Sequence, residues 1–301
     1  MGDGNHKPRV SVGMPVYNCK KYVAEAIESN LRQTFTDFEL VITDNCSTDG
    51  SDEICRAYAS KDSRIKYHRN PKNVGAGGNF QRCFDLSVGE LFRWTPSDDV
   101  VGPELLELCV SVLDRDPSVI LAYPQTRLID GEGQIIRDYD ENLHLMQERP
   151  STRMMEAAQR LRLCNVQYGV TRREILAKTG MMRNYAGGDI PLILEMALYG
   201  KFYEVPEHLF YRRMHEAASS AMKDVKDVMN LFDPTKKDKL FLYNWVQLGA
   251  NFKSVARSPI IFSEKMRASW FLFRRAIMGR NAYAQELGQA VSYYTHRPKR
   301  S

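Results

Sequence analysis

Short apolar runs alternate with amphipathic stretches along the first 125 residues, and this alternation predicts strands and helices in turn. The runs Val10–Met14 and Phe38–Thr43 have the length of strands. The second run contains Leu40, Val41 and Ile42 in succession, which is typical of a strand covered on both faces. Further strands are predicted at Ile65–Tyr67, Leu91–Trp94 and Val119–Tyr123.

Between these strands, apolar residues recur at helical spacing. Val23, Ile27 and Leu31 lie four residues apart, and Asn18 stands where its side chain can cap that helix. Further helices are predicted at Ser51–Ser60 (capped by Ser47 or Asp49), Gly75–Leu86 and Pro103–Leu113. Alternating strands and helices predict an α/β fold with a mostly parallel sheet flanked by helices. Ligands then bind beyond the carboxyl ends of the strands.

The pattern changes after Tyr123. The segment Asp130-Gly131-Glu132-Gly133 predicts a hairpin turn. Helices are predicted near Met154–Leu163, Arg172–Lys178 and Ile190–Tyr199, a strand at Phe202–Val205, and a mostly helical tail from about Ala221. We therefore divide the chain into residues 1–125, residues 126–220 of the same domain, and a C-terminal extension of residues 221–301.

Composition narrows the class of protein. Of the 301 residues, 43% are hydrophobic and 26% are charged, which excludes a disordered or collagen-like chain. No apolar run approaches the ~18 residues needed to span a bilayer, and the polar segment Met1–Arg9 lacks the apolar stretch of a signal peptide. The six cysteines are scattered without a C-x-x-C pair, so no zinc site is expected. We expect a cytoplasmic protein with reduced thiols.

The net charge of +5 is unevenly distributed. Residues 230–301 carry thirteen Lys and Arg against four Asp and Glu, which suggests an anionic partner for this segment. Within it, an amphipathic helix is predicted at Pro259–Gly279, with an apolar face of Phe262, Met266, Trp270, Phe273 and Ile277. This face can pack against the rest of the chain or a second copy in a homo-oligomer, or dock peripherally on the inner face of an anionic membrane. No nucleic-acid-binding motif accompanies the charge, so nucleic acid is not an expected partner.

Carboxylates follow two of the predicted strands. Asp44 ends the second strand, and Ser97-Asp98-Asp99 follows the fourth. Hard divalent cations prefer such oxygen ligands, whereas a solvated loop acid or a helix cap is the alternative for either site alone. Both sites follow the carboxyl ends of predicted parallel strands, where ligands bind, so together they favour a nucleotide–metal site.

Several short motifs, in their order along the chain, resemble those of family 2 glycosyltransferases. They are Pro15-Val16-Tyr17-Asn18, Asp44-Asn45-Cys46-Ser47-Thr48-Asp49-Gly50-Ser51, Asn73-Val74-Gly75 with Asn79, Asp98-Asp99, Gly188-Asp189, Gly200-Lys201-Phe202, Val205-Pro206-Glu207 and Tyr211-Arg212-Arg213-Met214-His215. The resemblance covers about residues 9–220. It implies the GT-A fold, a nucleotide-sugar donor bound by residues 1–125, an acceptor bound by residues 126–220, and an inverting transfer to an acceptor hydroxyl.

The resemblance assigns the donor site residue by residue. Asp44 would accept a hydrogen bond from the imide N–H of uracil or thymine, which predicts a UDP- or dTDP-sugar. Pro15 and Tyr17 would shape the wall of that pocket, although Pro15 also ends a strand by removing a hydrogen-bond donor, so a structural role is an equal alternative. Asn18 and Asn79 belong to the same nucleotide-sugar site.

The resemblance also implies a bound Mn²⁺ or Mg²⁺ ion. Asp99 is assigned to the metal and Asp98 to the ribose or the metal. His215 is assigned to the metal or the diphosphate, and Arg213 to the phosphate oxygens. The family pattern has one more Asp where Pro96 stands, so this site is reduced. A divalent ion would offset the charge on the departing diphosphate.

Asp189 holds the position of the general base in the resembling family. It would take the proton from the acceptor hydroxyl on the face of the sugar opposite the diphosphate. Because it precedes an apolar helix, it can also serve as an N-cap. The family usually has Glu at the preceding position, where Gly188 stands. The expected acceptor is a cell-surface polysaccharide or glycolipid, with a site lined by Asn165, Gln167 and Tyr168.

Three other classes of protein were weighed. The run Gly75-Ala76-Gly77-Gly78 invites a dinucleotide-binding interpretation, but such a loop should follow the first strand directly. A sugar-phosphate nucleotidyltransferase would need a Gly-rich, Arg-containing loop at that same place, and it is absent. A non-catalytic nucleotide-sugar-binding or scaffold protein on the same fold remains the alternative, because Pro96, Gly78 and Gly188 replace side chains that the family uses.

Overall fold

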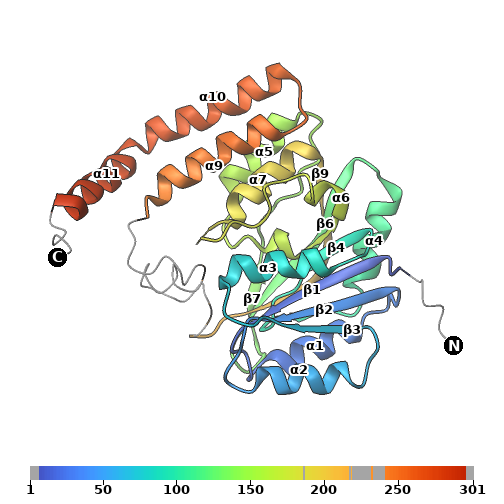
Figure 1. The fold of residues 1–301 in the computed structure, drawn as a ribbon. Coiled ribbons are helices and arrows are strands. Elements are labelled where there is room, and N and C mark those ends of the chain that lie inside the picture. Colours follow the sequence, from blue (N-terminus) through green and yellow to red (C-terminus); the bar gives the residue numbers. More distant parts are fainter. Residues whose placement is uncertain (1–6, 186, 217, 219–231, 233–240, 296–301) are drawn as a thin grey trace.

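The computed structural model describes residues 7–185, 187–216, 218, 232 and 241–295, and these residues contain one nine-stranded mixed sheet (Figure 1). Its strands are β1 (Val10–Val16), β2 (Phe38–Asp44), β3 (Ile65–Arg69), β4 (Leu91–Trp94), β5 (Val100–Val101), β6 (Val119–Ile129), β7 (Ile135–Tyr139), β8 (Val170–Arg172) and β9 (Lys201–Arg213). They are ordered β3-β2-β1-β4-β8-β6-β9-β5, and β7 pairs with β6. Because β8 joins β4 to β6, residues 1–125 and 126–220 share the sheet.

The first four strands set the position of the site. β3, β2, β1 and β4 are parallel to one another, so their carboxyl ends meet at one edge. In register, Val16 at the end of β1 pairs with Asp44 at the end of β2, and Asp44 pairs with Arg69 at the end of β3. The loops that follow these strands therefore lie side by side, which is where ligands bind in sheets of this type.

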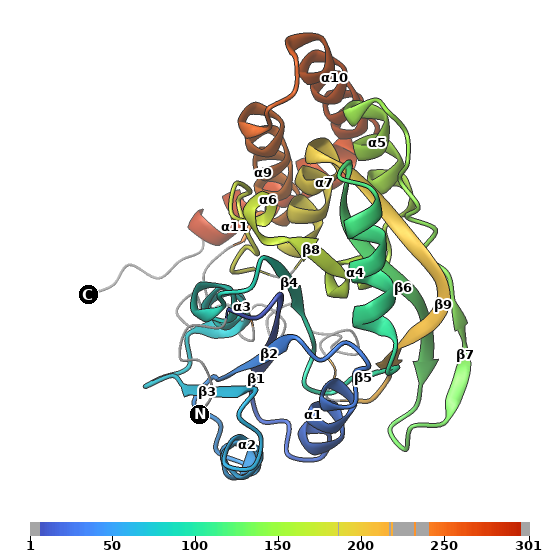
Figure 2. The same cartoon turned by 90° about the vertical axis from the view of Figure 1, so that its right-hand side faces the viewer.

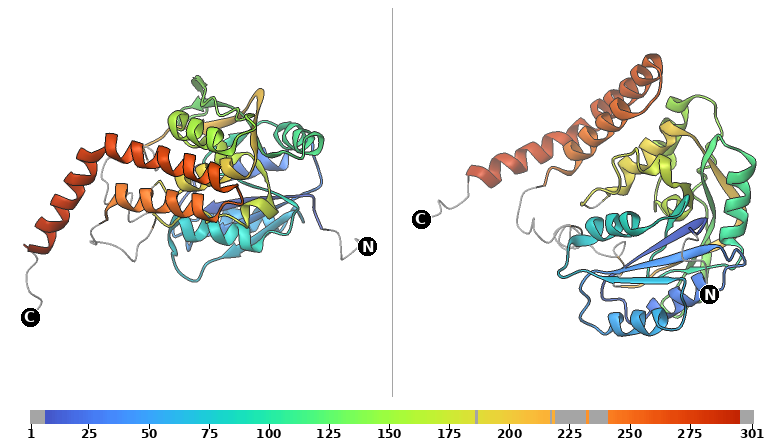
Figure 3. Two further views of the ribbon diagram at one scale, coloured as in Figure 1. Left: turned by 90° about the horizontal axis from the view of Figure 1, so that it is seen from above. Right: turned by 45° about the vertical axis from the view of Figure 1, so that its right-hand side comes forward.

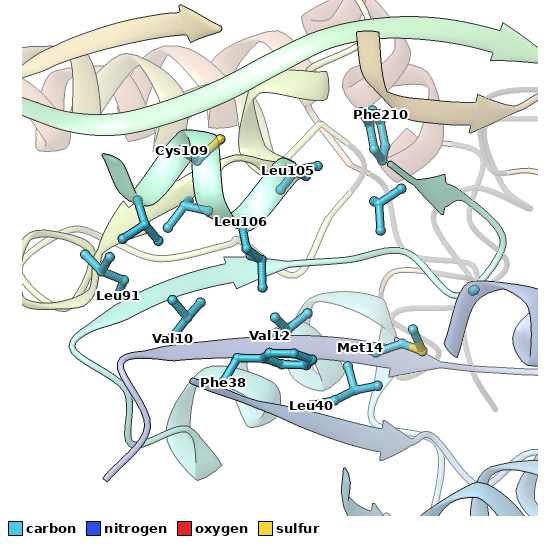
Figure 4. Close-up of a cluster of buried hydrophobic side chains, with 14 of the residues drawn as sticks. Val10, Val12, Met14, Phe38, Leu40, Leu91, Leu105, Leu106, Cys109 and Phe210 are labelled. Atoms are coloured by element: carbon cyan, nitrogen blue, oxygen red, sulfur yellow. The ribbon is translucent and has the colours of Figure 1, made fainter. Parts of the chain in front are cut away.

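Helices cover both faces of the parallel strands. α1 (Val23–Leu31) and α2 (Ser51–Ala59) lie on one face and α3 (Gly75–Leu86) on the other, while α4 (Leu105–Arg115) packs along β6 and β9 (Figure 2). Side chains alternate along β1, so Val10, Val12 and Met14 all enter the core that Leu106 of α4 closes (Figure 4). Burial of each such side chain contributes about 1.5–3 kcal/mol.

The remaining helices build a layer at the far end of the sheet. They are α5 (Pro150–Arg160), the 3₁₀ helix η1 (Asn165–Tyr168), α6 (Arg173–Leu176), α7 (Asp189–Tyr199), α9 (Tyr243–Arg257), α10 (Phe262–Met278) and α11 (Arg280–Thr295). α9 packs on α7, α10 packs on α5 and α9, and α11 extends away from the body of the molecule (Figure 3). None of the described helices has the length and apolarity needed to cross a bilayer.

The predicted strands and helices are confirmed where the structure describes them, including the hairpin at residues 130–133, closed by the Asp130 N–H bond to the carbonyl oxygen of Gln134. β6 and β9 extend well beyond the predicted Val119–Tyr123 and Phe202–Val205, because they pair with each other along most of their length. Of the tail predicted from Ala221 onward, residues 221–231 and 233–240 lie outside the described residues.

Two predicted helix caps are wrong, and one of the alternatives for the apolar face of the C-terminal helix is contradicted. Asn18 does not cap α1, whose N-cap is Tyr22 without a side-chain bond; its Oδ1 accepts the N–H of Thr48 at 2.9 Å instead. The apolar face of α10 does not pack against the rest of the described chain, because its side chains point to solvent. Neither Ser47 nor Asp49 is the N-cap of α2, which is Gly50 without a side-chain bond; Asp49, the residue before it, accepts the N–H of Ser51 at 3.0 Å.

Candidate functional site

A cavity of about 1030 Å³ lies beyond the carboxyl ends of β1 and β4. Six predicted site residues line it, namely Pro15, Tyr17, Asn18, Asp98, Asp189 and His215. Four others, Asp44, Asn79, Asp99 and Arg213, lie outside its described wall. The cavity thus gathers the loops after β1, β4 and β9 and the start of α7, which are far apart in the sequence.

Asp98 and His215 form a pair on this wall. Asp98 Oδ2 lies 3.1 Å from His215 Nε2. Asp98 stands in the turn before β5 and His215 just after β9, and the antiparallel pairing of β5 with β9 brings the two turns together. The Tyr22 ring packs against the imidazole with centroids 4.7 Å apart, which restricts its orientation. A carboxylate oxygen and an imidazole nitrogen together can bind a divalent metal.

The pair fits a metal that arrives with its substrate. Among the described residues, no three His, Cys, Asp or Glu side chains cluster closely enough to enclose an ion. Pro96, which replaces the further acid of the family pattern, is on the cavity wall. Because Mg²⁺ commonly takes one or two protein carboxylates and completes its coordination with waters and substrate phosphates, two protein ligands are sufficient here.

Asp99 and Arg213 lie behind this pair. Asp99 Oδ1 accepts the backbone N–H of Arg213 at 2.7 Å, and burial together with the charge of Asp98 raises the pKa of Asp99. The buried Arg213 guanidinium donates to the carbonyl oxygens of Asp98 and Asp130 and to the carboxylate of Glu25. The structure therefore brings Asp98, and not Asp99, to His215. Arg213 supports Asp98 by donating a hydrogen bond to its carbonyl oxygen.

Asp44 and Asn79 lie inside the edge of the sheet. Asp44 is fully buried; its Oδ1 accepts the N–H of Ser47 at 3.0 Å, and its Oδ2 accepts the Tyr67 hydroxyl at 3.2 Å. Arg69 Nη1 lies 3.2 Å from the same Oδ2. Asn79 donates to the backbone of β2 at 2.8 Å. These contacts fix the loop after β2, and base recognition by Asp44 stays a prediction.

Asp189 is the first residue of α7, whose N-cap is Gly188, so the alternative role of Asp189 as N-cap is wrong. Its Oδ2 lies 3.4 Å from Gln167 Nε2, and its Oδ1 accepts the N–H of Ile190 at 3.0 Å. Burial raises the pKa of Asp189 in spite of these bonds. A raised pKa brings a carboxylate closer to the range in which a general base works well.

Gly188 cannot be replaced by the Glu of the family pattern without rearrangement. A Cβ at this position would lie 2.3 Å from the carbonyl oxygen of Arg183, which is closer than real Cβ contacts come. The chain therefore reaches Asp189 by a close backbone approach between residues 183 and 188. Asp189 lies on the cavity wall although the residue before it differs from the family pattern.

The predicted acceptor residues are partly confirmed. Gln167 and Tyr168 line the cavity, whereas Asn165 is buried and its Oδ1 accepts from Arg212 Nη1 at 2.6 Å. Sequence reasoning missed Glu141, whose buried carboxylate accepts the backbone N–H groups of residues 162, 164 and 165 at 2.7–3.0 Å. It thereby holds the segment that presents Gln167. An isolated Glu after β7 carries no signal that could have revealed this.

Three cations on the cavity wall were also missed: Lys20, Lys21 and Arg212. Cationic side chains at this place suit an anionic ligand such as a diphosphate. Lys20 and Lys21 follow the Pro15–Asn18 motif after one residue, so a basic pair close to the first strand was the available signal. Arg212 was passed over for its neighbour Arg213, because only the pairing of β9 decides which of the two faces the cavity.

The mixed sheet, its covering helices and the cavity at the strand ends define the class of protein as a GT-A glycosyltransferase fold. Residues 11–180 match the model of glycosyl transferase family 2, and the chain belongs to that family. S. aureus TarS 1–349 in complex with UDP-GlcNAc superposes with a TM-score of 0.67 at 18% identity, covering 93% of this chain and 80% of that one.

The chain is also similar to a second solved structure and to a curated relative. The mannosyltransferase PcManGT from Pyrobaculum calidifontis, in complex with GDP-Man and Mn²⁺, has a TM-score of 0.52 at 16% identity, over 96% of this chain and 88% of that one. Chondroitin synthase from Escherichia coli is 35% identical over 132 residues, which are 43% of this chain and 19% of the synthase. The chain spans half or less of the length of the first curated relatives that it matches.

Proposed function

We propose that this chain is an inverting glycosyltransferase that moves a sugar from a UDP- or dTDP-sugar to a hydroxyl of a cell-surface polysaccharide or glycolipid, on the cytoplasmic side of the membrane. The observation that carries the proposal is that Asp189 and the Asp98–His215 pair line one cavity. Inversion needs a base for the acceptor on one side of the anomeric carbon and charge stabilisation for the diphosphate on the other. Family membership, the UDP-GlcNAc complex of TarS and the similarity to a chondroitin synthase support a nucleotide-sugar donor and a glycan product.

The diphosphate would lie beside Asp98 and His215. These residues would hold a Mn²⁺ or Mg²⁺ ion, which, when bound, offsets the charge on the leaving diphosphate. Lys20, Lys21 and Arg212 on the same wall supply further positive charge. The Mn²⁺ complex of PcManGT supports this assignment by fold similarity.

Asp189 would act on the acceptor. As the acceptor oxygen forms its bond to the anomeric carbon, the bond from that carbon to the diphosphate breaks, and the hydroxyl proton passes to an Asp189 carboxylate oxygen. Gln167, 3.4 Å from Asp189 Oδ2, would hold the carboxylate in its orientation. A single displacement of this kind inverts the anomeric centre.

Thermal unfolding with a panel of nucleoside diphosphates, each with and without Mn²⁺, tests the donor site. A ligand that binds the folded state raises the unfolding midpoint by mass action. We expect UDP or dTDP to raise it more than GDP, ADP or CDP, and to do so more strongly with Mn²⁺. No shift with any nucleoside diphosphate would contradict the proposed donor.

Donor hydrolysis separates the enzyme from a non-catalytic scaffold. An active transferase should release nucleotide slowly from its donor in water, because water can replace the acceptor. Asp189→Asn should stop the release while the donor still stabilises the fold. Donor binding without any turnover, with or without acceptor, would instead favour a binding or scaffold protein.

A further inference from the structure

The apolar face of α10 lies on the surface of the molecule. Phe262, Met266, Trp270, Phe273 and Ile277, here called the α10 stripe, recur every three or four residues and so share one side of the helix. Their exposed fractions run from 47% for Ile277 to 77% for Phe262. α10 forms the outer edge of the molecule, on the far side of α9 from the sheet (Figures 1 and 3). Large side chains gathered in such a patch mark a contact surface.

The opposite side of α10 already holds the helix to the protein. Glu264, Ala268 and Leu272 are buried and recur every four residues. The Glu264 carboxylate accepts both the N–H and the hydroxyl of Ser151, at 3.0 and 2.5 Å. Rotating α10 to bury the stripe would break these contacts. The stripe is therefore turned outward by the packing of the helix itself.

The charge around the stripe is positive. Arg267 and Arg274 are exposed and lie two turns apart along one edge of the stripe. The only acids of α10 and α11, Glu264 and Glu286, are both directed at other helices; Glu286 accepts from Asn244 at 2.8–3.1 Å. The hydrogen bond from Ser151, together with the nearby charge of Arg267, lowers the pKa of Glu264. The Glu264 carboxylate is buried against Ser151, however, so the exposed surface around the stripe still has more cations than acids.

We propose that the α10 stripe binds the surface of a membrane that contains anionic phospholipids. An interfacial helix of this kind buries its apolar face at the acyl boundary while the flanking cations attract headgroup phosphates. Trp270 and Phe273, with ring centroids 5.7 Å apart, form an aromatic pair suited to that depth.

A second copy of the chain fits the stripe less well than a lipid surface. A two-fold contact through the stripe is self-complementary only if charges on one copy find partners on the other. It would bring Arg267 and Arg274 toward the same cations, while Glu264 and Glu286 are already hydrogen-bonded to Ser151 and Asn244 within their own copy. The membrane contact is independent of the proposed activity, so its failure would leave the transferase proposal standing.

Co-sedimentation of the full chain with vesicles tests the proposal. One set is phosphatidylcholine with about a third phosphatidylglycerol, and the other is phosphatidylcholine alone. We expect binding at least about tenfold tighter to the anionic set, weakening as salt is raised. The double variant W270S/F273S should lose at least about tenfold on the anionic set. R267Q/R274Q should lose roughly thirtyfold there, with little change on phosphatidylcholine alone.

Matched controls separate the stripe from general surface apolarity. The double variant I135S/I136S removes two exposed apolar side chains from β7 and should bind like the wild type. Trp270→Phe keeps the stripe apolar, so it should keep the binding but lose most of the blue shift in tryptophan fluorescence that accompanies it.

Three results would overturn the proposal. The first is equal sedimentation with and without anionic lipid, and the second is unchanged binding in W270S/F273S. The third is a wild-type dimer in light scattering that becomes a monomer in W270S/F273S, because a second copy would then cover the stripe.

Discussion

Asp98 and His215 are 117 residues apart in the sequence, yet Asp98 Oδ2 and His215 Nε2 lie 3.1 Å apart on the wall of one cavity. The contact depends on the pairing of β5 with β9, which sets the turn after β4 against the end of the longest strand. Asp99, next in sequence, faces away and accepts the N–H of Arg213. One residue of register therefore decides which carboxylate can reach a ligand.

The first prediction concerns this pair. Asp98→Ala and His215→Ala should each remove the Mn²⁺-dependent part of the stabilisation by UDP, because each removes a proposed metal ligand. Asp85→Ala removes an exposed carboxylate from α3, outside the cavity wall, and should keep the Mn²⁺ effect. Unfolding midpoints with UDP, with and without Mn²⁺, measure the outcome. An unchanged Mn²⁺ effect in both pair variants would mean that the metal, if bound, lies elsewhere.

The second prediction concerns catalysis by Asp189. Asp189→Asn should lower donor turnover by about 10²–10⁴-fold, since the amide cannot accept the proton. UDP affinity should change little, because the diphosphate is expected on the opposite side of the sugar. The acidic limb of the pH–rate profile should lie above pH 3.8, the ordinary value for Asp, because burial raises the pKa of Asp189. A limb at or below that pH would contradict this assignment.

The third prediction concerns folding stability: ionised Asp189 should destabilise the folded chain at neutral pH. Because the pKa of Asp189 is higher in the folded than in the unfolded chain, the folded state binds its proton more tightly. Stability from this group is therefore present at low pH and is lost as pH rises from the unfolded value through the folded one. Asp189→Asn should raise the unfolding midpoint at neutral pH, and the difference from wild type should shrink toward pH 3.8.

The fourth prediction concerns Glu141, a positioning residue. Glu141→Gln should lower the free energy of unfolding by about 1–3 kcal/mol, because an amide offers one oxygen to three N–H donors, two of them buried. It should also raise the KM for acceptor more than it lowers kcat, because the segment carrying Gln167 loosens. Glu148→Gln, an exposed change paired with Lys201, should do neither. Chemical denaturation and acceptor kinetics report the two effects separately.

The fifth prediction separates two adjacent arginines. Arg213→Met should cost about 3 kcal/mol of stability, since it leaves the partly buried carbonyl oxygens of Asp98 and Asp130 and the Glu25 carboxylate without their donor. Arg212→Met should cost less stability but weaken UDP binding by roughly tenfold, because Arg212 lines the cavity. Titration of UDP into each folded variant measures the affinities. A larger loss of UDP affinity in Arg213→Met would restore its predicted phosphate role.

The order of elements was largely predictable because it depends on local patterns. The continuous run Leu40–Ile42 and the alternation along Val10–Met14 each determine a strand without reference to the rest of the chain. The lengths of β6 and β9 were not predictable, because partners elsewhere in the sheet extend them. The cap at Asn18 failed for a similar reason, since its side chain is taken by the N–H of Thr48 in a neighbouring loop.

The sequence by itself determined the α/β order, the motifs placed at strand ends and the amphipathic pattern of α10. Each of these features depends only on residues that are close together in the sequence. Tertiary structure alone decided that Asp98 and Arg212 reach the cavity while Asp99 and Arg213 do not. It also decided that the apolar stripe of α10 faces outward. Adjacent residues on a strand or turn point to opposite sides, and the side that meets a cavity, a core or solvent is set by pairing and packing between distant segments.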